Sequence, residues 1–127
     1  MEQGLVKATI LNPTYTAREL IQRCWDVADA CGWNQGKLPI PEQIALIHSE
    51  ASEALESYRN NEELIWFREA TKGNFKPEGL LAEYADIVIR VFHYARTMTT
   101  PEHFEKIISD KLDYNATRGF KHGGKVC

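Results

Sequence analysis

Hydrophobic residues recur at helical spacing along most of the chain, with apolar side chains three or four positions apart. The first predicted helix covers residues 16–31, because Thr16 followed by Glu19 is a capping box and Gly32 ends the pattern. The second predicted helix covers residues 41–60, and its apolar positions fall on one arc about 100° wide. These positions are Ile44, Ile47, Ala51, Ala54, Leu55 and Tyr58.

The third predicted helix, residues 79–98, is apolar around nearly its whole circumference. Such a helix belongs in the centre of a bundle, where other helices or partner subunits cover its faces. Its interior polar side chains fall within about 80° of one another on a helical wheel and form one stripe. They are Glu83, Asp86, Arg90 and His93. We expect this stripe to face either water or a polar cavity.

The fourth predicted helix starts with Thr100 as N-cap and Pro101 at its first position, and it continues to about Thr117. Residues 60–78 connect the second and third helices. Gly73 is one of the residues that break any long helix there, so we expect only a short helix inside this connection. Four main helices without a convincing strand pattern predict an all-α, four-helix-bundle-like fold.

Size and charge limit the classes of function. The 127 residues fit a single domain, with residues 1–15 as a lead-in and residues 119–127 as a flexible basic tail. The formal net charge of -3 argues against a nucleic-acid polymer or a membrane surface as partner, since both usually require a basic surface. Three cysteines without zinc-type spacing argue against a disulfide framework or a thiolate metal site. No signal-peptide pattern and no long apolar stretch is present, so we expect a cytoplasmic protein with no membrane partner.

Two pairs of carboxylates carry the candidate chemistry. Glu50 and Glu53 lie three residues apart in the second predicted helix, and Glu83 and Asp86 have the same spacing in the third. Residues three apart project from one face of a helix, so packing the two helices side by side would bring four acids together. Four close carboxylates repel one another unless a divalent cation neutralises them. The pattern therefore predicts a metal site.

The donor atoms indicate which ion the site would prefer. Oxygen donors without a thiolate or a close histidine pair suit Mg²⁺, with Mn²⁺ as a substitute. Because Mg²⁺ usually keeps several waters and binds substrate phosphates, we expect a phosphorylated ligand. The alternative is that Glu50 and Glu53 are ordinary surface acids and that Asp86 pairs with Arg90 four residues later.

The C-terminal end supplies positive charge. Lys111, Asn115 and Arg118 follow one another at helical spacing, and Lys125 comes directly after two glycines. Lysine and arginine bind phosphate oxygens, and flexible glycines allow backbone N–H groups to approach an anion. These residues either form a phosphate clamp or belong to a frayed basic tail.

Three segments resemble the MazG-like, all-α nucleoside triphosphate pyrophosphohydrolases. Residues 46–59 (LIHSEASEALESYR) are similar to the first metal motif of that family, and residues 83–90 (EYADIVIR) to the second. The ending from Lys111 to Lys125 is similar to that of a phage and bacterial single-domain branch. The resemblance implies a MazG-type fold that is completed by assembly as a homodimer or homotetramer. It also implies magnesium-dependent hydrolysis of a nucleoside triphosphate to the monophosphate and pyrophosphate.

The resemblance further implies roles for individual residues. The metal ligands of the catalytic centre would be Glu50, Glu53, Glu83 and Asp86. The contacts to substrate phosphates would be Lys111, Asn115, Arg118 and Lys125. Chemically, bound ions would activate a water for in-line attack on phosphorus, or Glu50 or Glu53 would orient that water as general base.

Two other functions remain open from the sequence. One is a narrower pyrophosphohydrolase that acts on phosphoribosyl-ATP or on one deoxynucleotide, instead of the general house-cleaning of nucleotide pools that we expect. The other is a non-catalytic helical interaction module, in which the acids form a solvated stripe.

Overall fold

The computed structural model describes residues 14–120, which form four α-helices and one two-stranded sheet. In chain order the elements are α2 (Ala17–Ala30), α3 (Ile40–Arg59), β1 (Trp66–Thr71), β2 (Asn74–Glu78), α4 (Leu80–Met98) and α5 (Pro101–Thr117). The fold is therefore mostly helical, as predicted, with a small sheet that was not predicted. Residues 1–13 of the lead-in and residues 121–127 of the tail, which include Lys125, lie outside the described residues.

Local capping chemistry fixes the starts of α2 and α5. The Thr16 hydroxyl accepts a hydrogen bond from the Glu19 N–H, and the Glu19 carboxylate accepts one from the Thr16 N–H, which completes the capping box. Thr100 caps α5 through the N–H of His103, and Pro101 occupies the first helical position. The four main helices are thus confirmed, with nearly the predicted bounds.

The prediction of a short helix within residues 60–78 is wrong, because this segment forms a β-hairpin. β1 and β2 pair antiparallel across a turn that contains Gly73, whose φ of +78° favours glycine. Pro77 is tolerated because both strands of a two-stranded sheet are edge strands. In β2, Phe75 and Pro77 alternate with Lys76 and Glu78 at the period of a strand, and reading Gly73 only as a helix breaker left this pattern unused.

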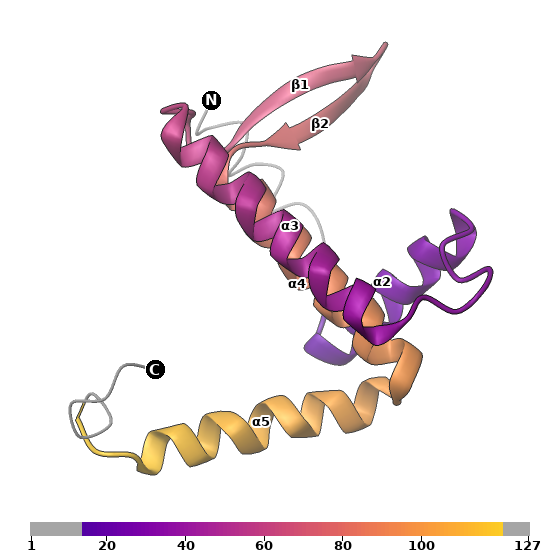
Figure 1. Cartoon of the computed structure of the whole chain (residues 1–127), viewed down its shortest axis with the longest axis vertical. Coiled ribbons are helices and arrows are strands. Elements are labelled where there is room, and N and C mark those ends of the chain that lie inside the picture. The colour runs from indigo at the N-terminus through magenta and orange to yellow at the C-terminus, as the bar shows by residue number, and fades with distance from the viewer. Residues whose placement is uncertain (1–13, 121–127) are drawn as a thin grey trace.

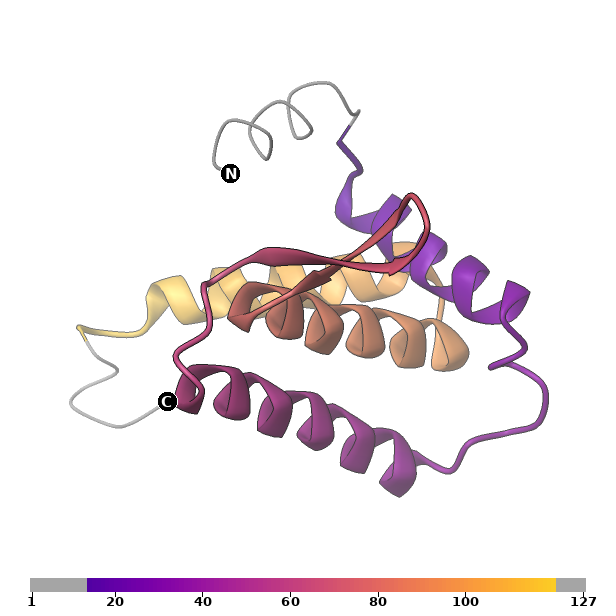
Figure 2. The same ribbon diagram turned by 90° about the horizontal axis from the view of Figure 1, so that it is seen from above.

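α3 and α4 lie side by side and run antiparallel, while α2 packs against the second half of α4 (Figure 1). Arg96 of α4 donates a hydrogen bond to Gln22 and lies over the Trp25 ring of α2. The hairpin projects from the end of the pair where α4 begins, and α5 leaves from the opposite end (Figure 2). Within the described part of the chain, α5 packs only on α2 and α4.

Few apolar side chains are buried in this arrangement. Among the described residues, the buried hydrophobic side chains are Ile21, Ala54 and Tyr94. The helices of one chain therefore enclose only a small hydrophobic core.

No helix in residues 14–120 has both the length and the apolar character required to cross a bilayer.

α3 is the clearest case, because it buries polar and small residues and exposes most of its apolar arc. Its buried residues are Gln43, Glu50, Ala54 and Ser57. Ile44, Leu55 and Tyr58 of the arc are 51%, 47% and 71% exposed. A large exposed apolar surface usually marks a site of association.

Candidate metal centre

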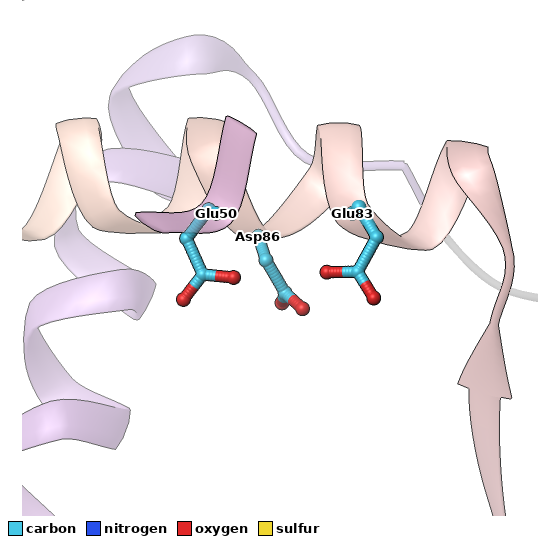
Figure 3. A group of neighbouring side chains, drawn as sticks. All are labelled: Glu50, Glu83 and Asp86. Carbon is cyan, nitrogen blue, oxygen red and sulfur yellow. The ribbon is translucent and has the colours of Figure 1, made fainter. Parts of the chain in front are cut away.

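Three carboxylates from two helices meet in the half of the α3–α4 pair that lies toward the hairpin. Glu50 comes from α3, Glu83 from the first turn of α4 and Asp86 from the turn after it. One carboxylate oxygen from each residue lies within 4.8 Å of the others. The three side chains point to the same side of α4 (Figure 3). These residues are called the acidic cluster below, and they are three of the four predicted metal ligands.

Glu50 is buried and is held by Arg90 of α4. Arg90 donates from Nε to Glu50 and from Nη1 to the Tyr94 hydroxyl, the latter over 3.0 Å. Burial raises the pKa of Glu50, but hydrogen bonds with Glu53 and Arg90 and nearby positive charge outweigh it and hold that pKa below its usual value. Arg90 therefore pairs with Glu50 across the helix interface, and not with Asp86 in its own helix as the alternative interpretation of the sequence had it.

The pKa values of Glu83 and Asp86 are both raised. Burial is the largest cause of the raised pKa of Glu83, and the negative charges of Asp86 and Glu50 add to it. For Asp86, burial again comes first and the charge of Glu50 second. Carboxylates that share a partly desolvated place hold protons more tightly, and a divalent cation removes this repulsion. The acidic cluster therefore carries an excess of negative charge that a metal ion would relieve.

Glu53 lies beside the acidic cluster, on the solvent side. It is exposed and one turn beyond Glu50 in α3. A hydrogen bond with Glu50 is the largest cause of its raised pKa, followed by burial and by the charges of the acidic cluster. Glu53 thus belongs to the same electrostatic unit, whereas Glu56, one turn nearer the end of α3, is an exposed residue outside it.

The donor set fits a hard divalent cation. The group consists of carboxylate oxygens, and no histidine or cysteine of residues 14–120 belongs to it. Mg²⁺ and Mn²⁺ favour such oxygen donors. Because three carboxylates do not complete an octahedron, positions remain for water and for phosphate oxygens. The residues present therefore fit the predicted ion.

The polar stripe of α4 continues beyond the acidic cluster to the loop after α2. His93 Nε2 lies 2.7 Å from Asn34 Oδ1, and Asn34 Nδ2 donates to the Trp25 carbonyl over 3.4 Å. Burial and the positive charge of Arg90 lower the pKa of His93. The stripe therefore contacts α3 at Arg90 and this loop at His93, so at both positions it faces protein.

A close backbone contact fixes the hairpin against the start of α4. Gly79 has a φ of +103°, and a Cβ at this position would lie 2.5 Å from the Glu63 carbonyl oxygen and 2.8 Å from that of Leu64. The Leu81 N–H donates to the same Leu64 carbonyl over 2.9 Å. Only glycine fits between these groups. Gly79 therefore fixes the position of the end of β2 relative to the acidic cluster.

Lys76 of β2 is a charged neighbour of the acidic cluster that the sequence interpretation missed. Its Nζ lies 3.0 Å from Glu78 Oε1. Its positive charge favours a lower pKa for each carboxyl group in the acidic cluster, and for Glu83 and Asp86 it is outweighed by burial and by neighbouring carboxylates. The alternation of Phe75 and Pro77 with Lys76 and Glu78 after Gly73 was the signal that could have placed this lysine on a strand.

The predicted phosphate contacts on α5 lie away from the acidic cluster. Lys111 and Asn115 occupy the second half of α5, Arg118 is its C-cap, and all three are exposed. Within residues 14–120, α5 does not pack on α3 or on the hairpin. It diverges from the α3–α4 pair toward its C-terminal end (Figure 1). One chain therefore does not bring these residues to its own acidic cluster, and Lys125 lies outside the described residues.

The site thus combines an acidic cluster built within one chain, a general-base candidate in Glu53 and a lysine on the adjoining hairpin. Comparison with known protein families, with curated proteins and with solved structures finds no match for this chain.

Proposed function

We propose that the chain is a magnesium-dependent nucleoside triphosphate pyrophosphohydrolase with a MazG-type fold, which hydrolyses its substrate to the monophosphate and pyrophosphate. The observation that carries the proposal is the acidic cluster, in which three carboxylate oxygens from two helices lie within 4.8 Å of one another. The resemblance of residues 46–59 and 83–90 to the two metal motifs of that family supports it. The cellular role would be house-cleaning of the nucleotide pool in the cytoplasm.

The residues of the chain have distinct parts in this reaction. Glu50, Glu83 and Asp86 would hold the ion, which when bound polarises phosphate oxygens and lowers the pKa of a coordinated water. Arg90 holds the carboxylate of Glu50 in a fixed orientation. The protein thereby positions an in-line attack on phosphorus, with pyrophosphate as leaving group.

Glu53 is the better of the two predicted candidates for general base. It is exposed at the edge of the acidic cluster, and its pKa is raised by its hydrogen bond with Glu50. A raised pKa makes a carboxylate a stronger proton acceptor near neutral pH. Glu50, in contrast, is buried against Arg90 with a lowered pKa, which suits a fixed metal ligand.

The proposal includes assembly as a homodimer or homotetramer. The exposed apolar arc of α3 and the small hydrophobic core of one chain support an association of several copies. Lys111, Asn115 and Arg118 diverge from the acidic cluster of their own chain. In this proposal they contact the phosphates of a substrate that another copy holds.

Replacement of one metal ligand tests the proposed activity. We expect Glu83→Ala to abolish magnesium-dependent pyrophosphate release, because it removes one of the three carboxylates of the acidic cluster. The measurement is product analysis over a panel of canonical and damaged nucleoside triphosphates, with far-UV circular dichroism to verify that the helices are retained. Glu56→Ala is the matched control, since Glu56 is an exposed glutamate of α3 outside the site.

Turnover retained by Glu83→Ala would contradict the site assignment. The same panel separates a general enzyme from one that acts on phosphoribosyl-ATP or on a single deoxynucleotide. An interaction module remains the second candidate function, because so much of the apolar arc of α3 is exposed. It predicts no pyrophosphate release from any nucleotide and no magnesium-dependent thermal shift with a non-hydrolysable triphosphate.

A further inference from the structure

The two faces of the hairpin differ in chemistry. The register pairs Arg68 with Lys76 and Trp66 with Glu78, and directly paired residues project from the same face. One face therefore carries Trp66, Arg68, Lys76 and Glu78. The opposite face carries Phe67, Glu69, Phe75 and Pro77. Arg68 and Lys76 thus lie on the same face as Glu78, the carboxylate with which both form ion pairs.

The charged face of the hairpin is organised around Glu78. Its carboxylate accepts from Lys76 over 3.0 Å and from Arg68 over 3.3 Å. The side chain of Glu78 is only 16% exposed, whereas that of Lys76 is 55% exposed. Glu78 therefore anchors the face, and the ammonium group of Lys76 remains accessible to a ligand.

This face adjoins the acidic cluster. Gly79 joins Glu78 directly to the start of α4, and its close contact with the backbone of Leu64 fixes the strand there. The strand that leads into α4 lies on the side of the helix to which the three carboxylates point (Figure 3). The charge of Lys76 acts on each of these carboxylates. One chain thus places a cation beside a group of metal ligands.

A polyphosphate bound through a metal ion at the acidic cluster would present further anionic oxygens on this side. An ammonium group has three donors, and Glu78 is the one ion-pair partner found for Lys76 among the described residues. Lysine acts on phosphate as a compact point charge, so it does not require the fixed geometry of an arginine fork. The predicted phosphate contacts on α5 cannot serve this role within the same chain, because α5 does not pack on the hairpin in the described residues.

We propose that Lys76 binds a phosphate group of a metal-bound polyphosphate in the same chain, with Glu78 as the residue that positions it. The inference rests on the proposed function, since it takes the acidic cluster as the metal site. It adds a phosphate contact on the β-hairpin, outside the acidic helices and outside the C-terminal end.

The test uses the whole chain and two probes, Mn²⁺ alone and inorganic triphosphate with Mg²⁺, both followed by isothermal titration calorimetry. Lys76→Ala should weaken the binding of magnesium triphosphate by about 10- to 100-fold, the range expected for a hydrogen bond to a charged group. The same variant should bind Mn²⁺ alone at least as tightly as the wild-type chain, because it removes a positive charge next to the acidic cluster. Lys76→Arg should retain most of the triphosphate affinity. Lys72→Ala removes an exposed lysine at the hairpin turn and should change neither affinity.

A purely structural role of Lys76 would not produce different effects of Lys76→Ala on the binding of the two probes. Unchanged triphosphate binding in Lys76→Ala would overturn the inference, and so would a parallel loss of Mn²⁺ affinity, which would indicate a displaced hairpin. Absence of magnesium triphosphate binding to the wild-type chain would also overturn it. If the wild-type chain binds inorganic triphosphate but hydrolyses no nucleotide, the proposed activity fails while the role of Lys76 is still decided by the titrations.

Discussion

Two neighbouring faces of α3 differ in what they contact. The face toward α4 buries Gln43, Glu50 and Ser57, and Glu50 is bonded to Arg90. The next face around the helix carries the apolar arc, most of which is exposed. In a helix packed only against its own chain, the apolar stripe faces the core.

The difference separates the two requirements that α3 has to satisfy. The polar face contributes Glu50 to the acidic cluster, which forms within one chain. Most of the apolar face is exposed among the described residues, and in the proposed assembly the hydrophobic gain from burying it would come from other copies. We infer that metal binding depends on the fold of one chain, and that turnover depends on the assembly.

A charged substitution in the apolar face of α3 should have the largest effect. We expect Leu55→Asp to weaken self-association by about 1000-fold, because a buried charge replaces an apolar contact in each of two symmetric copies, at about 2 kcal/mol or more per copy. Light scattering over a range of protein concentrations would show a fall in mass toward that of one chain. The variant should still bind Mn²⁺ and should lose pyrophosphate release, if α5 of another copy supplies phosphate contacts.

Ala45→Asp is the matched control for this experiment, since it adds the same charge at an exposed position on another side of α3. Its mass should equal that of the wild-type chain. A wild-type chain that is monomeric at all concentrations, or a Leu55→Asp variant with unchanged mass, would contradict the association of copies through the apolar arc.

The sequence predicted those parts of the fold that depend on local rules. Thr16 with Glu19 and Thr100 with Pro101 located two helix starts, because capping involves neighbours along the chain. The hairpin was missed, since β1 shows no alternation of apolar and polar residues and Gly73 was taken only as a helix breaker. A small exposed hairpin lacks the continuous apolar pattern by which strands are usually recognised.

The site could be predicted only in part, because the sequence does not determine how each helix is rotated about its own axis. The spacing of Glu50, Glu83 and Asp86 placed acids on helix faces, but only tertiary packing decides which face turns inward. Nothing local indicates that Arg90 would bond across to α3, because a partner four residues away in its own helix was equally available. Phosphate contacts on α5 could not be located either, since the direction of α5 depends on the turn after α4.

Removal of the bond between Arg90 and the polar face of α3 should have an intermediate effect. Arg90→Ala leaves the buried carboxylate of Glu50 without its partner. We expect a loss of about 1–2 kcal/mol in the free energy of unfolding without metal, toward the low end because Arg90 is 35% exposed and screened by solvent. Saturating Mg²⁺ should recover part of this loss, since the ion takes over the neutralisation of Glu50.

Urea unfolding at one protomer concentration, with and without Mg²⁺, measures both effects. Lys106→Ala is the control, because its ion pair with Asp110 is 70% and 60% exposed and should contribute little. An Arg90→Ala variant as stable as the wild-type chain in EDTA would show that the bond to Glu50 does not hold the polar face together.

The smallest effect concerns the pH dependence of the acidic cluster. Burial and neighbouring carboxylates raise the pKa of Glu83 and of Asp86, so the folded state holds these protons more tightly than the unfolded state does. Their contribution to stability therefore falls as the pH rises from the ordinary carboxyl pKa through the raised values, and the full repulsion remains at pH 7. The contribution of Glu50 to stability depends on pH in the opposite way. Its pKa is lowered, so it stabilises the folded state above its unfolded pKa, and this stability is lost as the pH falls through the folded value.

We therefore expect Glu83→Gln in EDTA to be slightly more stable than the wild-type chain at pH 7. The stability of the variant should also change less between pH 7 and pH 5 than that of the wild-type chain, as thermal unfolding would show. A destabilised Glu83→Gln at pH 7 would mean that Glu83 stabilises the fold without metal, and that the acidic cluster is a structural feature instead of a site whose repulsion a cation relieves.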